Sequence, residues 1–419
     1  MDPGTHREFF SKRFEVVLGQ TEDGRPCTAF GVAQLSGSLF NPDQGRSRYR
    51  VHRLYVGSHF ASEKDIAFTG QTVEFSYLED WLSINPFQFI RNDEANKLTI
   101  EMPVETQEIA TLRLTDRTTT LSLHLGKTLS FDGRGEFEGA RRAWFEIKPD
   151  NAQPHAWFED FSGSLGNFLT ICVGEPVFPR RVSGRRAIVC ESENPVEKDI
   201  DIYLRLPEGR EKDDVSYADM PFPFRAIRQT AESLLSSWFS LEERIGPVFG
   251  LLLGTYYNSR MYVETEFLTL MQALEIFHRR LVKGSYVQPS EWLPYLDELL
   301  RAIPSTLSSS HRKSLSKRLE YGYEYSLRKR LNDIVGSLND AVQKRITGGN
   351  SNFVAECADT RNALVHEGGG GIESKGLVAM HRTNRQLRAL LNVLIWKQLG
   401  LPDETFTDDW FRRLGVELQ

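Results

Sequence analysis

The sequence predicts an α+β protein in which a β-rich N-terminal region precedes an all-α C-terminal region. Residues 1–215 contain many short runs of β-branched and aromatic residues, punctuated by Gly, Pro, Asn and Asp. This pattern favours antiparallel sheets of the sandwich or barrel-like kind. From residue 222 to residue 419, apolar residues recur at three- and four-residue spacing, which is typical of helices in a bundle. We therefore predict two domains, residues 1–215 and 222–419.

The strands of the first domain are expected where side chains suited to a pleated surface alternate or cluster. In chain order the runs are RFEVVLG, RYRVHRLYVG, QTVEFSYL, KLTIEM, TLRLT, TTTLSLHLG, AWFEIKP, FLTICVG, RAIVCES and DIDIYLRLP. One short helix is expected near residues 157–168, where HAWFEDFSGSLGNFL loses the period of two.

The boundary between the domains is expected in the polar segment PEGREKDDVSYADMPFPF, because prolines interrupt it before any periodic pattern resumes. The helices predicted after it cover residues 225–239, 241–254, 258–282, 290–302, 310–321, 326–346, 352–366 and 375–399.

Composition and charge limit the classes of function. The chain has 419 residues and a net charge of −6, which argues against a general nucleic-acid coat. Residues 216–419 hold 25 Lys and Arg against 23 Asp and Glu, and residues 1–215 hold 26 against 34. The C-terminal half is therefore the better host for an anionic ligand.

The chain also lacks the usual signs of membranes, export and metal sites. No apolar run approaches the roughly 20 residues that span a bilayer, and the N-terminus has no apolar signal core. The four cysteines, Cys27, Cys172, Cys190 and Cys357, are far apart in the sequence. We expect reduced thiols, a cytoplasmic location, no metal, no cofactor and no membrane partner.

The candidate site lies in the predicted helix 352–366. Arg361 falls on the same stripe as the apolar residues Cys357 and Val365, four residues away on either side. A guanidinium on an apolar face is costly unless an anion meets it. Asn362 and His366 are four residues apart and share a face. The glycines 368–371 that follow are expected to end the helix.

These three residue types suit cleavage of RNA without a metal. An imidazole can take the proton of a 2′-OH or protonate the leaving 5′-oxygen. A guanidinium can hold the phosphate while charge grows on it. The alternative is structural: His366 caps the helix and Arg361 forms a salt bridge between domains.

Further candidates lie on two other predicted helices. Glu275 is placed to orient an active-site base, and basic residues alternate with tyrosines in the segment 311–330. Cations and aromatic rings together are what binding of single-stranded RNA requires. The residues predicted to contact RNA are Arg279, Arg280, Lys329, Arg330, Tyr323 and Tyr325. The alternative is that these residues are solvated or paired in ordinary helix salt bridges.

The segment Arg361-Asn362-Ala363-Leu364-Val365-His366 resembles the R-x4-H motif of HEPN-domain ribonucleases. Four other stretches are similar to segments of the Apea-like HEPN group: FLTLMQALEIFHRRL, SLRKRLNDIV, QTVEFSYLEDWL and FLTICVGEPVFP. The first two resemble helices of the HEPN domain, and the last two resemble parts of the β-rich domain that accompanies it.

This resemblance implies a helical domain that dimerises so that two R-x4-H motifs face one cleft. It implies metal-independent endoribonuclease activity that leaves a 2′,3′-cyclic phosphate and a 5′-OH. It also implies a role in bacterial anti-phage abortive infection, with the β-rich domain sensing a phage-derived trigger. The residues carried over are Arg361, Asn362 and His366, with Glu275 and Arg328 as supporting residues. Exposed RNA loops such as those of tRNA are the implied substrate.

Two other classes of function stay open at this point. In one, the helices bind RNA or nucleotides without cutting them, and the β domain binds a partner. In the other, the β domain binds sugar or peptide through Trp81, Trp144 and Trp157, and the helical bundle is structural. Packing in the core is the alternative role for these tryptophans.

Overall fold

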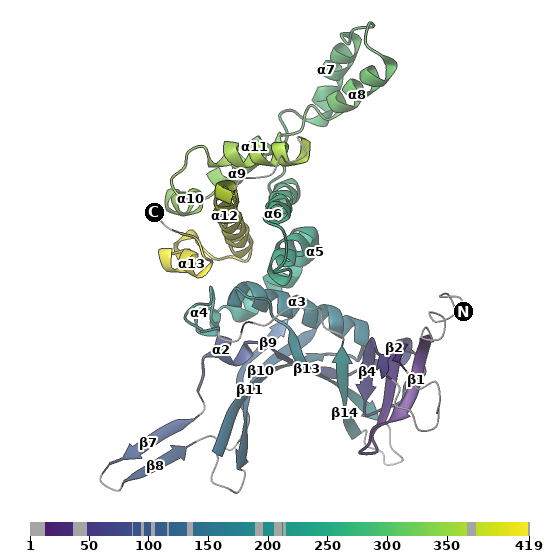
Figure 1. Ribbon diagram of the computed structural model, residues 1–419, viewed down its shortest axis with the longest axis vertical. Helices are drawn as coiled ribbons and strands as arrows, with labels where there is room; N and C mark the ends of the chain where they lie inside the picture. The colour runs from purple at the N-terminus through teal and green to yellow at the C-terminus, as the bar shows by residue number, and fades with distance from the viewer. Residues whose placement is uncertain are drawn as a thin grey trace, which may run out of the picture. The chain divides into compact units, whose positions relative to one another are not determined.

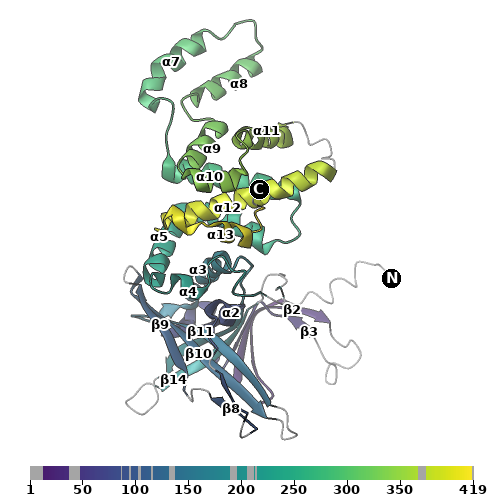
Figure 2. The same ribbon diagram turned by 90° about the vertical axis from the view of Figure 1, so that its left-hand side faces the viewer.

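A computed structural model describes residues 13–36, 48–85, 87–93, 96–101, 105–114, 117–131, 137–188, 196–204, 212, 215–366 and 374–417. The chain divides into two compact units, residues 1–239 and 240–419. Figures 1 and 2 show their elements. The prediction of a β-rich antiparallel region followed by an all-helical region is confirmed.

The first unit is organised around one ten-stranded antiparallel sheet with the order β1-β2-β4-β14-β13-β6-β11-β10-β9, and β3 pairs with β2. Its strands are β1 (Arg13–Gln20), β2 (Pro26–Ser36), β3 (Arg48–Arg50), β4 (Arg53–Val56), β6 (Gly70–Phe75), β9 (Gln107–Leu114), β10 (Thr119–Phe131), β11 (Phe137–Pro149), β13 (Pro179–Ile188) and β14 (Val196–Leu204). Three pairings, β4 with β14, β13 with β6 and β6 with β11, join strands far apart in the sequence, so long-range pairing unites the local hairpins into one sheet.

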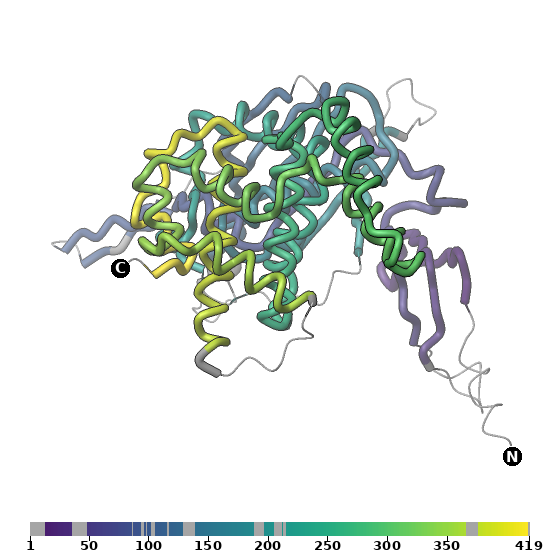
Figure 3. The backbone as a smooth tube through the Cα atoms, turned by 90° about the horizontal axis from the view of Figure 1, so that it is seen from above, coloured from purple at the N-terminus to yellow at the C-terminus, as the bar shows by residue number. Residues whose placement is uncertain are grey.

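Two short strand pairs and a short helix complete the β region. β5 (Ala67–Phe68) pairs with β12 (Gln153–Pro154), and α2 (Leu78–Leu82) follows β6. β7 (Gln88–Asn92) pairs with β8 (Lys97–Glu101) in a hairpin that extends from the sheet (Figures 1 and 3).

The core of the first unit lies between the sheet and the helix α3 (His155–Val173). Phe158 of α3 packs edge to face on Phe68, with ring centroids 6.2 Å apart. Gly184 on β13 leaves room for that ring, because a Cβ at this position would lie 2.6 Å from it. One helix therefore covers a face of the sheet that a second sheet would cover in a sandwich.

The helix predicted near residues 157–168 is present in α3, but the strand predicted for FLTICVG is wrong. Residues 168–173 form the second half of α3, and every one of them is buried. A segment that is apolar on all sides shows neither a period of two nor a period of 3.6, so its sequence does not distinguish strand from helix.

The three tryptophans considered for a sugar site make packing contacts within the first unit. Trp81 is buried, and its Nε1 donates to the Phe222 carbonyl at 2.8 Å. The ring of Trp144 stacks on His124, and the ring of Trp157 stacks on Phe161. These contacts favour the core role for the tryptophans.

The helices follow in chain order. They are α4 (Phe224–Ile227), α5 (Ala231–Tyr257), α6 (Val263–Phe277), the π-helical turn η3 (His278–Val282), α7 (Pro289–Arg301), α8 (Ser309–Glu320), α9 (Leu327–Gly336), α10 (Asp340–Thr347), α11 (Phe353–His366), α12 (Ser374–Gln398) and α13 (Asp408–Arg413). Within the described residues, no helix has both the length and the apolar character that a membrane span needs.

The centre of the helical unit is the pair α6 and α12. Leu270 and Leu274 of α6 and Leu391 of α12 are completely buried. Asn384 of α12 donates to the Val263 carbonyl at 2.9 Å, and Arg388 pairs with Glu266. The buried polar groups fix how far α12 slides along α6, because only one register satisfies them.

Two predicted helix boundaries differ from the structure. The predicted helices 225–239 and 241–254 are largely one helix, α5, with non-helical backbone at Ile245 and Pro247 just beyond it. The predicted helix 326–346 is instead two helices, α9 and α10. The side chain of Asn339 caps the start of α10 by accepting a hydrogen bond from the Val342 backbone nitrogen at 2.9 Å. A new helix therefore begins here, separate from α9.

Candidate active site

The helix α11 carries the three residues predicted to be catalytic, Arg361, Asn362 and His366. Its first turns are anchored, because Phe353, Cys357 and Ala358 are all buried. Burial raises the pKa of the Cys357 thiol to about 12, with Glu356 adding to the effect, so this cysteine stays a neutral core residue. The second half of the helix is more open, and Val365 is 49% exposed.

Arg361 continues the line of Phe353 and Cys357 at the point where this burial ends. Its side chain is half-buried, and its Nη1 lies 3.4 Å from the Asn362 Oδ1, a long contact for a hydrogen bond. Among the described residues no carboxylate pairs with Arg361. A guanidinium in this position is available to an anionic group from outside the unit.

α11 runs unbroken from Phe353 to His366, so position 366 falls one helical turn after Asn362. The side chain of His366 lies outside the described part of the structure. Asp359 falls on the same face, three residues before Asn362 and seven before His366. Arg328, at the start of α9, donates to Asp359 at 2.7 Å. The structure therefore brings a second guanidinium to the helix face that carries Asn362. The segment 367–373, which contains the four glycines Gly368 to Gly371, lies outside the described residues.

Glu275 is engaged in a different way from the sequence interpretation. Its Oε1 accepts from Nε and Nη2 of Arg279 at 3.1 and 3.0 Å. Arg279 in turn donates to Glu324 at 2.5 Å. Glu275 therefore holds Arg279, a residue that the sequence analysis assigned to RNA, in a chain of ion pairs.

Arg330 forms the centre of this chain and is buried, with only 3% of its surface exposed. It donates from Nε to the Tyr325 carbonyl at 3.1 Å and from Nη2 to Glu324 at 3.4 Å. Its Nη1 lies 3.1 Å from Nδ1 of His278, which is completely buried. Burial lowers the pKa of Arg330, and the neighbouring Arg279 acts in the same direction.

His278 is neutral in this arrangement. Since the Arg330 guanidinium can only donate, Nδ1 of His278 accepts, and Nε2–H donates to Asp333 at 3.3 Å. Burial lowers the pKa of His278, and this outweighs the hydrogen bond to Asp333. The group of Glu275, His278, Arg279, Glu324, Arg330 and Asp333 is called the ionic cluster below.

The remaining predicted RNA contacts also have partners within the helical unit. Lys329 pairs with Asp333, and its Nζ lies 5.1 Å from the centre of the Tyr325 ring. Arg280 donates to the Arg244 carbonyl at 3.0 Å, next to the kink in α5. The Tyr323 carbonyl accepts from the Tyr286 backbone nitrogen at 2.8 Å.

Three acidic partners were missed in the sequence: Asp359, Glu324 and Asp333. Asp333 had a local signal, since it lies four residues after Lys329 on one helix. Asp359 shares a helical face with Asn362, which is also readable. Glu324 had no local signal in the sequence, because its partner Arg279 lies 45 residues away from it.

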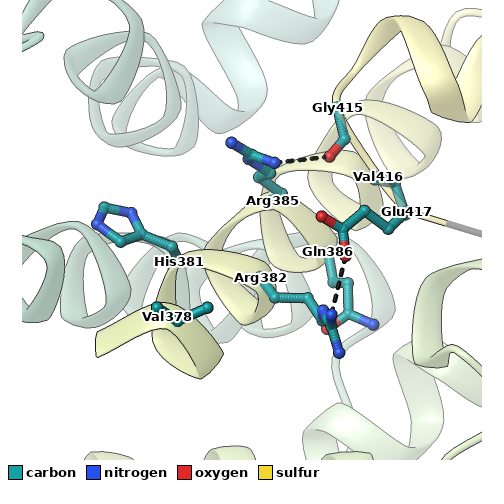
Figure 4. Close-up of a pocket in the computed structure, with 8 residues that line it drawn as sticks. All are labelled: Val378, His381, Arg382, Arg385, Gln386, Gly415, Val416 and Glu417. Carbon is teal, nitrogen blue, oxygen red and sulfur yellow. Dashed lines mark hydrogen bonds and ion pairs between the residues drawn. The ribbon is translucent and has the colours of Figure 1, made fainter. Parts of the chain in front are cut away.

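A basic pocket of about 330 Å³ lies between α12 and the chain after α13 (Figure 4). Its lining residues are Val378, His381, Arg382, Arg385, Gln386, Gly415, Val416 and Glu417. Arg382 pairs with Glu417 at 2.9 Å, and Arg385 donates to the Gly415 carbonyl at 3.4 Å. Arg382 and Arg385 therefore already have partners within the pocket wall. Within the described ranges, no group of three or more His, Cys, Asp or Glu residues is arranged to hold a metal ion.

Comparison with known protein families gives two matches, one to the N-terminal part of the chain and one to the C-terminal part. A family model described as ApeA N-terminal domain 1 matches residues 2–238. A second model, described as Apea-like HEPN, matches residues 268–405, which include α11 and the ionic cluster. No curated protein and no solved structure gives a significant match.

Proposed function

The chain belongs to the family of Apea-like HEPN proteins that carry an ApeA N-terminal domain, and from this premise we propose that it is a metal-independent endoribonuclease of anti-phage defence. The observation that carries the proposal is the state of Arg361. This half-buried guanidinium has no carboxylate partner among the described residues, and His366 ends the same helix five residues later.

In the proposed reaction, Arg361 binds the non-bridging oxygens of one phosphate in RNA. The 2′-oxygen attacks that phosphorus while His366 takes the 2′-OH proton. The bond from phosphorus to the 5′-oxygen breaks, and a second acid protonates the leaving oxygen. The products are a 2′,3′-cyclic phosphate and a 5′-OH. Arg361 stabilises the transition state because negative charge on the equatorial oxygens is greatest there.

The second acid is proposed to be His366 of another copy of the chain. One histidine cannot be base and acid for two oxygens on opposite sides of the phosphorus in the same step. The exposed Val365 and half-buried Leu364 beside the motif provide apolar surface for such a homodimer. Asn362 would orient the phosphate or the imidazole, and Arg328, held by Asp359, would support the same face.

The first unit is proposed to sense the trigger and restrain the nuclease. It has a pocket of about 810 Å³ at β6, β10, β11 and the segment before β7. Ion pairs of Glu74 with Arg142 and of Asp80 with Arg141 line it. A pocket with charged side chains in its lining suits recognition of a polar phage-derived molecule.

The test is cleavage of total RNA and tRNA by the purified full-length chain. His366→Ala should lower kcat by about 10²–10⁴ and Arg361→Ala by about 10²–10³. His52→Ala and Arg412→Ala, which change exposed residues of the same types, should cut at the wild-type rate. Products should carry 5′-OH ends, and EDTA should not change the rate.

Cleavage that survives both active-site substitutions, or that EDTA abolishes, would overturn the mechanism. RNA that is bound tightly and never cut under any trigger would instead favour a non-catalytic RNA-binding protein.

A further inference from the structure

The hairpin of α7 and α8 stands clear of the other helices of its unit (Figures 1 and 2). We call residues 287–322 the arm. Its helices pack on each other: Trp292 Nε1 donates to the Leu319 carbonyl at 3.0 Å. A Cβ at Gly322 would lie 2.5 Å from the Trp292 ring, so the glycine permits this contact. No residue of either helix is buried, so the arm contributes little to the core of the unit.

The base of the arm is nevertheless held firmly. Ser285 and Glu324 form an antiparallel bridge, and Tyr286 packs edge to face on Tyr325, with ring centroids 4.9 Å apart. The Glu324 carboxylate accepts from both Arg279 and Arg330 of the ionic cluster. The cluster therefore fixes the arm to α6 and α9, and α9 contacts the catalytic helix through Arg328 and Asp359.

The two helices of the arm carry opposite charge. α8 has four cations and one acid, whereas α7 has three acids and one cation. Leu315 and Leu319 of α8 are half-buried on the side of α7, and Lys313 and Lys317 lie on the opposite side of α8. The cations of α8 are Arg312, Lys313, Lys317 and Arg318.

Most of these cations are free to meet a ligand. Within the described residues, Arg312, Lys313 and Arg318 have no carboxylate partner, and Lys317 has only the exposed pair with Glu320 at 3.1 Å. The hydroxyls of Ser310 and Ser314 lie on the same outer face. Tyr321 follows directly and is 59% exposed.

We propose that the outer face of α8 binds the phosphate backbone of single-stranded RNA and that Tyr321 stacks on a base. The inference rests on the proposed function, since it concerns the substrate of that nuclease. Lysine, arginine and serine are the side chains that contact phosphates, and an exposed ring is a stacking platform for any base. The acidic α7 faces away from this ligand, so the arm binds RNA on one side only. The RNA surface therefore lies on α8, whereas Arg279, Arg330 and Lys329 hold the arm in place.

The experiment measures RNA binding separately from cleavage. The full-length chain with Arg361→Ala and His366→Ala is titrated against a fluorescein-labelled single-stranded RNA of mixed sequence at several KCl concentrations. The arm variant adds Lys313→Gln, Lys317→Gln and Arg318→Gln, which change the cations on the outer face of α8 and at its edge. A matched control adds Arg260→Gln, Lys344→Gln and Arg412→Gln, three exposed cations on other elements of the same unit.

The arm variant should bind RNA at least about tenfold more weakly in low salt, and its slope of log K against log salt should be smaller by about 2. Tyr321→Ala should weaken binding by about fivefold or more with an unchanged slope. The control should match the parent. Circular dichroism and thermal unfolding should show that the arm variant is folded.

Unchanged affinity and slope in the arm variant would overturn the proposal, as would an inability of the parent to bind this RNA. A changed oligomeric state with unchanged RNA affinity would make the arm a protein interface instead. Failure of the nuclease is distinguishable: RNA bound through α8 but never cut refutes only the proposed activity. RNA cut by the otherwise wild-type arm variant with unchanged kcat/KM refutes only the arm.

Discussion

Replacement of Arg330 by methionine should lower the free energy of unfolding of the helical unit and should not weaken RNA binding directly. The residue is 3% exposed, and all three of its polar contacts are to atoms of the same unit. Methionine keeps much of the apolar stem but leaves Nδ1 of His278 and the Tyr325 carbonyl without a donor. Glu324 loses one of two cations.

The magnitude follows from these groups. Each buried acceptor left without a partner costs about 1–3 kcal/mol. The Glu324 carboxylate is 27% exposed and keeps Arg279, so its share is small. The sum is about 3 kcal/mol, at the lower end of the range for breaking a buried ion pair. For a unit of this size the loss corresponds to a Tm lower by about 6–12 °C.

The assay is hydrogen exchange of α6 and α9 amides together with thermal unfolding of the full-length chain. A double-mutant cycle with His278→Leu sharpens it, because the double variant removes the stranded acceptor along with its donor. The double variant should recover more than about 1 kcal/mol relative to the sum of the single losses. A stability change below about 0.5 kcal/mol for Arg330→Met, or strict additivity in the cycle, would refute the role given to this cluster.

Three further predictions concern single residues. Burial lowers the pKa of His278, so the unfolded imidazole takes a proton before the folded one; stability is full above about pH 6.5 and falls as the pH decreases below it. Denaturant midpoints at pH values on both sides of 6.5 measure this slope, which should be smaller in His278→Gln. Asn339→Ala should cost about 1 kcal/mol, because α10 loses the cap on the Val342 nitrogen; a neutral result in urea unfolding would contradict the cap. Gly184→Ala should cost about 1–3 kcal/mol in the first unit, since its Cβ would meet the Phe68 ring at 2.6 Å, and a Phe68→Leu background should relieve it.

Much of the fold was predictable because its signals are local. Alternating runs identified most strands of the sheet but not β2 (Pro26–Ser36), and three- and four-residue spacing identified the helices. The break after Gly336 was also readable, since Asn339 before Asp340 is a helix start signal. The second half of α3 was not readable, because its environment is buried on every side and leaves no period in the sequence.

The candidate site likewise has a part that local sequence predicts and a part that only tertiary packing creates. Arg361, Asn362 and His366 lie within one helical turn and a half, so their relation follows from helical geometry alone. Arg330 and His278 are 52 residues apart, and only the packing of α9 on the end of α6 brings them together. The sequence interpretation therefore assigned Arg330 to RNA contact, although its charge is buried and paired within the unit.

The basic and aromatic segment 311–330 shows why composition alone could not locate an RNA surface. Its residues are continuous in the sequence, but the fold divides them at the base of the arm. Before Gly322 the cations lie on an exposed helix without core contacts, and after it Arg330 is buried and Lys329 is paired. A cation whose charge is already matched by a carboxylate gains little from a phosphate, because the new contact must replace an existing one. Arg361 and three cations of α8, Arg312, Lys313 and Arg318, have in common that no carboxylate among the described residues matches their charge, and Lys317 has only an exposed pair with Glu320. The proposed path of RNA therefore joins the arm to the catalytic helix, and the ionic cluster keeps the two in a fixed relation.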